Sequence, residues 1–295
     1  MKEEYISDSE IRVIGNVSDP KRKPTPKRGW WKLVIPIVLL IGILIFLFLF
    51  VRQQEPAPIE EVEPELFEQS QPVSVPNPLR PWLNSLDTIT SVGTIIKDTS
   101  VNDIPLRIYM PLNSTPHLEI GYNVAHSAHQ NILFFQAADV RADNGKIVGA
   151  FVLKGKPLSW GLSKKGFCAI IDKQVTVGVM DNSPLFEMST ECNGDFFRQY
   201  PLVDKGQLVE NELKNKAIRR ALCDVDGYIA VLETQSKESL HDFAQALVDI
   251  GVDNAIYLVG GTAMGWAMDE KGNGTKMGIW DGHKIKNISF IVWRR

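Results

Sequence analysis

The feature that most constrains this chain is the uninterrupted apolar run at residues 33–51, LVIPIVLLIGILIFLFLFV, which lies between Lys32 and Arg52. A helix of this length rises about 1.5 Å per residue and so spans a hydrocarbon core roughly 30 Å thick. A cleaved signal peptide would lie closer to the start and end in a small-residue cleavage site. A buried core helix would carry a polar stripe, and the run has none. The sequence therefore predicts a single-pass transmembrane helix at 33–51.

The charges on the two sides of this run predict its orientation. The preceding segment is basic, with Lys21, Arg22, Lys23, Lys27, Arg28 and Lys32, whereas the following one carries Glu55, Glu60, Glu61, Glu63, Glu65 and Glu68. The positive-inside rule places the N-terminus in the cytoplasm, and Trp30 and Trp31 suit the cytoplasmic interface. This topology signal accounts for the basic cluster, so we expect a membrane partner and no nucleic acid. The expected location is a bacterial inner membrane, with the C-terminal domain in the periplasm.

Composition divides the rest of the chain into three parts. Residues 1–32 are polar and contain Pro20, Pro24 and Pro26, which is typical of a disordered cytoplasmic tail. Residues 52–80 are rich in Pro and Glu and have almost no apolar periodicity, so we expect an extended linker there. Residues 81–295 remain for one folded domain, which is long enough to bury a sizeable core.

Within this domain, short runs of β-branched and aromatic residues alternate with turn residues. The runs lie at 104–110, 117–122, 131–136, 147–153, 166–171, 175–180, 217–223, 227–233, 255–259 and 287–293. This pattern is typical of strands joined by tight turns. The expected fold class is α+β, a strand-rich domain with a mixed sheet and few helices.

Two helices are expected beside these strands. The first is at 239–250, where Ser239 suits the N-cap, Asp242 follows three residues later and Gly251 suits the end. The second, at 82–98, has a weaker pattern.

Three cysteines, Cys168, Cys192 and Cys223, fall in the part expected to be exported. An oxidising compartment would allow two of them to pair, and Cys192 in its loop is the best candidate for a bridge. For Cys168 and Cys223, which lie in strand patterns, the alternative is a buried free thiol. Their spacing predicts no metal site, and no motif predicts a cofactor.

Adjacent glycines, Gly260 and Gly261, follow the strand expected at 255–259 and precede Thr262. Glycines allow a backbone to approach a ligand closely, and consecutive amides can bind an anion. A tight turn that serves only packing is the alternative, and composition alone leaves both open.

Several segments of residues 130–295 occur in an order that points to one family. They are RQYPLVDKG at 198–206, AIRRAL at 217–222, Asp226-Gly227 with the strand 228–234, LHDFAQALVDIGVDNAIYLVGG at 240–261 and FIVW at 290–293. Together they resemble the phosphodiester glycosidase family, in particular its uncovering-enzyme domain. This resemblance implies a hydrolase that separates a sugar from a phosphodiester.

The chain also departs from the family pattern. Val259 occupies the acidic position of the family's L-D-G-G-x-S segment, and the glycine expected after Gln199 in Q-x-G-P is missing. The early turn reads QAADV at 136–140 where the family has N-A/G-G-x-F. Loss of a carboxylate removes an acid, a base or a positioning charge. A member without it has either relocated that carboxylate, for example to Asp139, or lost catalysis.

The resemblance and the chemistry together indicate candidate site residues. Substrate-binding candidates are Arg198, Gln199, Arg219, Gly260, Gly261 and Thr262, and catalytic candidates are Glu233, Asp139 and His241. Guanidinium groups bind phosphate in a bidentate manner, and a carboxylate or imidazole transfers protons. Only one of Arg219 and Arg220 can face the site from a strand, and alignment with the family favours Arg219. The structural alternatives are an ion pair or solvated face for an arginine, a solvated strand end for Glu233 and a surface position for His241.

Two functions follow. The first is an exported, membrane-anchored hydrolase that cleaves a sugar phosphodiester in an envelope glycan. The second is a catalytically lapsed member that binds a glycan or scaffolds an envelope assembly.

Overall fold

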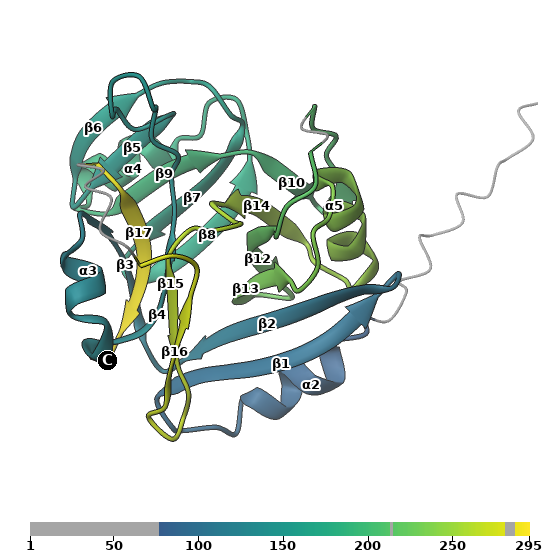
Figure 1. The fold of residues 1–295 in the computed structure, drawn as a ribbon. Helices are drawn as coiled ribbons and strands as arrows, with labels where there is room; N and C mark the ends of the chain where they lie inside the picture. Colours follow the sequence, from purple (N-terminus) through teal and green to yellow (C-terminus); the bar gives the residue numbers. More distant parts are fainter. Residues whose placement is uncertain (1–76, 213–214, 281–286) are drawn as a thin grey trace, which may run out of the picture. The chain divides into compact units, whose positions relative to one another are not determined.

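A computed structural model describes residues 77–212, 215–280 and 287–295 (Figure 1). Within these ranges, no helix is long and apolar enough to cross a membrane. The transmembrane helix expected at 33–51, the tail at 1–32 and nearly all of the linker at 52–80 lie outside the described residues and stay predictions.

The largest sheet has seven strands in the order β1-β2-β13-β12-β14-β10-β11. The strands are β1 (Gly93–Val101), β2 (Ile104–Leu112), β10 (Pro201–Asp204), β11 (Gln207–Leu208), β12 (Arg220–Val225), β13 (Tyr228–Thr234) and β14 (Asn254–Leu258). Turns with left-handed backbone reverse the chain between them, as at Asn102-Asp103 and Asp226-Gly227. The long β1–β2 hairpin lies along one edge of this sheet (Figure 1).

Two five-stranded sheets complete the β-structure. One has the order β16-β15-β4-β17-β3, with β3 (Thr115–Ile120), β4 (Asn131–Gln136), β15 (Gly265–Met268), β16 (Gly274–Met277) and β17 (Ser289–Arg294). The other has the order β6-β5-β9-β7-β8, with β5 (Ala150–Leu153), β6 (Lys156–Trp160), β7 (Gly166–Ile171), β8 (Gln174–Val179) and β9 (Asp195–Gln199).

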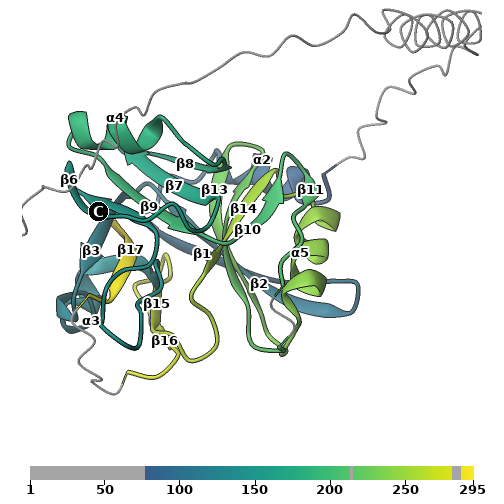
Figure 2. The ribbon, with the colours of Figure 1, turned by 90° about the horizontal axis from the view of Figure 1, so that it is seen from above.

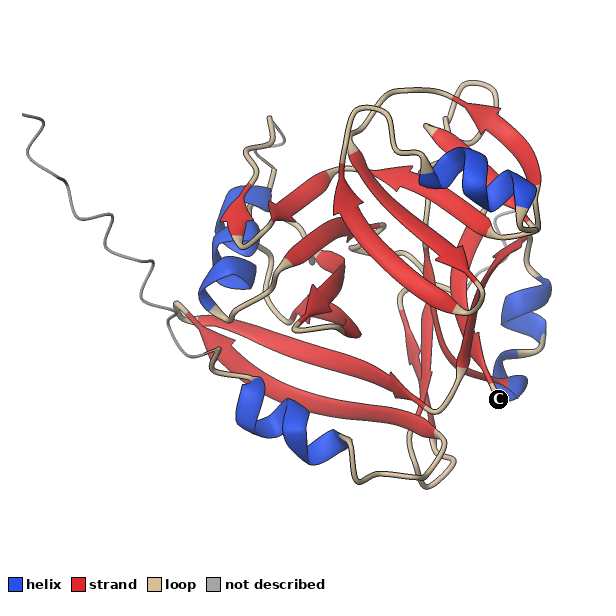
Figure 3. Cartoon of the chain, turned by 180° about the vertical axis from the view of Figure 1, so that it is seen from behind, coloured by secondary structure: helices blue, strands red, loops and turns tan. Residues whose placement is uncertain are grey.

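The helices cover the outer faces of these sheets. The longest, α5 (Leu240–Asp249), packs with α2 (Arg80–Leu86) on one face of the seven-stranded sheet. The short α4 (Leu185–Glu191) covers the third sheet, and α3 (Asn123–His126) with a 3₁₀ turn at Ala128–Gln130 covers the second. Figure 2 shows α5 beside β10 and β11 and α4 beside β7, and Figure 3 shows the helices outside the strands.

The inner faces of all three sheets share one hydrophobic core. Leu222 and Val231 of the first sheet, Phe135 of the second, and Phe151 and Phe197 of the third belong to it. Side chains alternate between the two faces of a strand, so Ala221 and Cys223 point instead toward α5. This alternation determines which side chains at the strand ends point into the shared core.

The strand-rich α+β class is confirmed, and two details differ from the expectation. The expected mixed sheet is wrong for the named strands, because every pairing among them is antiparallel, both within hairpins and between strands far apart in the sequence. The helix expected at 82–98 is also wrong beyond its first turns, since α2 ends at Leu86 and β1 begins at Gly93. Strand β1 begins with two buried residues and then alternates half-buried and exposed residues as it pairs with β2.

The helix expected at 239–250 is confirmed in α5. The hydroxyl of Ser239 caps it by accepting from the amide of Asp242 at 3.0 Å. Cys192, the best candidate if any bridge formed, is free, as are the other two cysteines of the described part. Cys168 and Cys223 are buried in two different hydrophobic clusters, as the alternative of buried free thiols predicts, whereas Cys192 is exposed.

Candidate functional site

Ends of strands from all three sheets meet around residues 136–139 and around residues 259–263, which we call the glycine turn. Strand β4 ends at Gln136, β9 at Gln199 and β14 at Leu258. The amide of Val259 donates to the Gln136 carbonyl at 3.3 Å, and Gln199 Nε2 donates to the Ala137 carbonyl at 3.2 Å. Segments far apart in the sequence are therefore held together at one edge of the shared core.

Lys164 lies at the centre of a polar group at this edge, which we call the Lys164 cluster (Lys164, Asp139 and Gln199). Its ammonium donates to the Asp139 carboxylate and to Gln199 Oε1, the latter at 2.9 Å. The same nitrogen lies 4.4 Å from the centroid of the Tyr200 ring. The Lys164 side chain is 5% exposed, whereas the Asp139 side chain is 32% exposed. The cation is thus buried and its carboxylate partner is open to solvent.

Burial sets the electrostatics of this cluster. Desolvation lowers the pKa of Lys164, and the neighbouring Asp139 carboxylate acts in the opposite direction. A buried ammonium beside an accessible carboxylate is an arrangement that can hold an anion and accept a proton at adjacent positions.

Arg220 and Glu233 form a second polar group, the Arg220 pair. They face each other on β12 and β13, and Arg220 Nε donates to Glu233 Oε2 at 2.7 Å. Arg220 Nη1 donates to the carbonyl of Val259 at 3.1 Å and lies 3.4 Å from that of Ala263. The pair therefore lies directly beneath the glycine turn.

Val259 joins the two groups through its backbone. Its amide donates to Gln136, at the start of the segment that ends in Asp139, while its carbonyl accepts from Arg220. Val259 thus connects the end of β4 to the Arg220 pair through its backbone, and its own side chain is apolar.

The glycine turn contributes close packing rather than free amides. The amide of Gly261 donates to the Ile218 carbonyl at 2.8 Å, and that of Gly260 donates to the Tyr257 hydroxyl at 3.3 Å. A Cβ atom at Gly260 would lie 2.5 Å from the Ile218 carbonyl oxygen, and Gly261 has a φ of +63°. The anion-binding amides considered for this turn are therefore already used within the fold, whereas Thr262 beside them is exposed.

Arg220, and not the favoured Arg219, faces the glycine turn. Arg219 is two residues before Ala221 and therefore faces the same side of the sheet, toward α5. There its Nε donates to the Glu238 carbonyl at 3.0 Å. Glu233, like Arg220, points to the inner face of the sheet, and its carboxylate is already engaged in the ion pair with Arg220.

The other sequence candidates lie apart from the Lys164 cluster. His241 is on the first turn of α5, with its side chain 53% exposed and its Nδ1 3.0 Å from the Glu210 carboxylate. Arg198 precedes Gln199 on β9 and therefore points to the opposite face of that strand. Of the candidates, the structure brings Asp139 and Gln199 together, since both bind Lys164. It also brings Glu233 close to the glycine turn, since Arg220 binds both Glu233 and the Val259 carbonyl.

Lys164 is the residue that sequence reasoning missed. It lies in the loop between β6 and β7, where no periodic pattern marks one lysine above its neighbour Lys165. Among the described residues, no group of three or more His, Cys, Asp or Glu side chains is placed to hold a metal ion.

Comparison with known proteins gives a likeness of fold. No protein-family model matches this chain, and no curated protein matches it. A hypothetical protein from Synechocystis is similar in structure at 11% identity with a TM-score of 0.51, covering 70% of this chain and 62% of that one. The catalytic domain of zebrafish N-acetylglucosamine-1-phosphodiester alpha-N-acetylglucosaminidase, auto-inhibited by its pro-peptide, is similar at 14% identity with a TM-score of 0.49, covering 69% of this chain and 82% of that one. At these identities the likeness concerns the fold alone.

Proposed function

We propose that this chain is a hydrolase that cleaves the bond between a sugar and a phosphodiester in an envelope glycan. The observation that carries the proposal is the Lys164 cluster, in which a buried ammonium joins Asp139 to Gln199. The resemblance of residues 130–295 to phosphodiester glycosidases agrees with this chemistry. Asp139 then serves as the relocated carboxylate for the acidic position that Val259 occupies.

In this mechanism the phosphodiester is cleaved and a phosphomonoester leaves as an anion, so the main needs are a cation for the phosphate and a base for water. Lys164 stabilises the departing phosphate, because a buried ammonium interacts with an anion more strongly than a solvated one. Asp139 takes a proton from the attacking water. The water oxygen bonds to the anomeric carbon as the bond between that carbon and the bridging phosphate oxygen breaks, and this oxygen keeps the electron pair. Gln199 keeps Lys164 in place through its Oε1.

We further propose that residues 33–51 anchor the domain in the inner membrane, with residues 1–32 in the cytoplasm and the domain in the periplasm. The charge asymmetry around the apolar run supports this orientation. The linker would then keep the domain within reach of envelope polymers.

The proposal is tested by following release of the sugar from a sugar-1-phosphodiester by the full-length chain in detergent. Asp139→Asn and Lys164→Met are each expected to lower kcat by about 10²- to 10⁴-fold, the usual contribution of a proton-transfer or charge-stabilising group. Asp143→Asn is the matched control, since Asp143 lies a few residues from Asp139 but pairs with Arg141 at the surface. Equal turnover by Asp139→Asn and wild type would remove Asp139 from the mechanism.

A lapsed, glycan-binding protein is the second candidate, and Val259 is the observation that favours it. Its backbone bonds to Gln136 and to Arg220, but its side chain supplies no charge. Saturable binding of the diester without turnover would favour this candidate over the hydrolase. Val259→Asp is then expected to bring turnover above the wild-type background, because it restores the family's carboxylate beside Arg220.

A further inference from the structure

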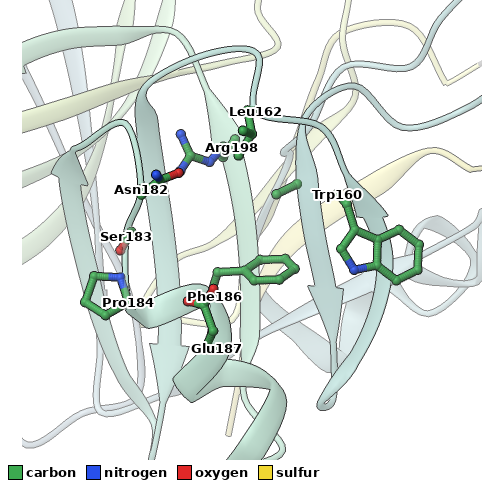
Figure 4. A pocket seen from close by; sticks show the side chains of 9 residues that line it. Trp160, Leu162, Asn182, Ser183, Pro184, Phe186, Glu187 and Arg198 are labelled. Atoms are coloured by element: carbon green, nitrogen blue, oxygen red, sulfur yellow. The ribbon is translucent and has the colours of Figure 1, made fainter.

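A pocket of about 470 Å³ lies on the face of the third sheet that is opposite the Lys164 cluster. Its apolar wall is made by Trp160, Leu162, Pro184 and Phe186, and Arg198 lines it from β9 (Figure 4). Trp160 and Leu162 are 65% and 68% exposed, which is unusual for such large apolar side chains. The volume is in the range of small-molecule sites.

Arg198 is a buried cation without a carboxylate partner. It is 2% exposed, and its terminal nitrogens donate to the carbonyls of Lys164, Met180 and Asp181 at 2.7–3.0 Å. Among the described residues, no carboxylate forms an ion pair with it, and its Nε has no hydrogen-bond partner. Because arginine stays protonated at neutral pH, its charge favours an anionic group in the adjoining pocket.

The remaining polar residues are arranged around this charge. Asn182 lies close to Arg198, whereas Glu187 on α4 lies at the other end of the pocket, with Phe186 between them (Figure 4). An anion is therefore favoured at the Arg198 end and hydroxyl groups at the Glu187 end. A flat indole such as that of Trp160 offers an apolar face and suits a ligand that is apolar on one side and polar at its edges.

We propose that this pocket is a second ligand site, which binds a sugar ring whose anionic substituent lies toward Arg198. The proposal rests on the proposed function and deepens it, since a glycan phosphodiester combines a sugar ring with an anion in each repeat. The substrate class is then a polymer with at least two phosphate-bearing units, one at the Lys164 cluster and one here. Lys164 connects the two sites around the end of the sheet, because its carbonyl accepts from Arg198 while its ammonium donates to Asp139.

The test measures binding of glucose 1-phosphate to the full-length chain by calorimetry, in the Lys164→Met background so that the Lys164 cluster does not contribute. Trp160→Ala is expected to raise Kd by about tenfold, and Trp160→Phe by less than about threefold. Leu158→Ala is the matched control, because Leu158 lies on the same strand and is 48% exposed but does not line the pocket. Glucose and inorganic phosphate are each expected to bind about tenfold more weakly than glucose 1-phosphate.

Two results would overturn the proposal: an unchanged Kd in Trp160→Ala, or equal affinities for glucose and glucose 1-phosphate. Thermal unfolding of each variant checks that it is folded, and the exposure of Trp160 makes its removal a mild change. Failure of the proposed function is seen separately, as absence of diester hydrolysis while glucose 1-phosphate still binds in a Trp160-dependent manner. Loss of the second site alone leaves hydrolysis of a small diester intact.

Discussion

Arg220 donates its Nε–H to Glu233 across 2.7 Å, from the first residue of β12 to the facing residue of β13. The two side chains are 1% and 9% exposed. The guanidinium also lies over Phe135, with Cζ 4.4 Å from the ring centroid. Because the same guanidinium donates to the Val259 carbonyl, this buried ion pair fixes the base of the glycine turn.

Removing one member of this pair should destabilise the fold strongly. We expect Glu233→Ala to lower the free energy of unfolding by about 3–5 kcal/mol, since it leaves the Arg220 charge buried without its partner. Asp98→Ala is the control, because Asp98 faces Arg107 in the same sheet but the pair is exposed, and such pairs contribute less than about 1 kcal/mol. Urea unfolding at pH 7 measures both, and equal losses would contradict a stabilising role for the buried pair.

The sequence predicts this fold well where one chemical pattern decides a local structure. Strands β4 and β7 occupy the predicted residues, and Ser239 caps α5 as expected. The facing of Arg219 and Arg220 could not be predicted in this way. Ala221, Leu222 and Cys223 follow them and are all buried, so both faces of β12 are apolar and alternation carries no signal.

The Lys164 cluster also lies beyond sequence reasoning for a physical reason. Asp139, Lys164 and Gln199 come from two loops and a strand end, and only the pairing of three sheets brings them together. Loop residues have no periodicity from which a direction could be inferred. Asp139 was a candidate through its place in the early turn, whereas Lys164 had no comparable signal.

The two glycines of the glycine turn are constrained differently, Gly261 by its left-handed backbone and Gly260 by close packing. Gly261 has open space around its Cα, so Gly261→Ala should cost only the left-handed backbone conformation, about 1–2 kcal/mol. Gly261→Asn should cost less, since asparagine tolerates this conformation. Gly260→Ala instead brings a Cβ to 2.5 Å from a backbone oxygen and should cost about 1–3 kcal/mol that asparagine does not recover. Urea unfolding of the four Ala and Asn variants checks this order.

The buried Lys164 predicts a pH dependence of stability. Because desolvation lowers the pKa of Lys164, the folded protein binds fewer protons than the unfolded chain between the folded pKa and the unfolded value of about 10.4. The contribution of Lys164 to the free energy of unfolding therefore rises as the pH increases between these two pKa values. The stability of wild type relative to Lys164→Met should increase as the pH rises toward the unfolded value of about 10.4. Lys165→Met, at an exposed neighbour, should show no such increase, and a parallel response of both variants would contradict the burial effect.

The three free thiols make the proposed topology testable in cells. Cys192 is exposed, whereas Cys168 and Cys223 are buried, so a folded domain offers one reactive thiol. If the domain lies in the periplasm, a maleimide that does not cross the inner membrane labels the wild-type chain in cells whose outer membrane alone is permeable. Cys192→Ser removes that labelling. A Ser18→Cys/Cys192→Ser chain should be labelled only after the inner membrane is broken, because residues 1–32 are expected in the cytoplasm. Labelling of Ser18→Cys/Cys192→Ser, but not of wild type, before that step would reverse the orientation.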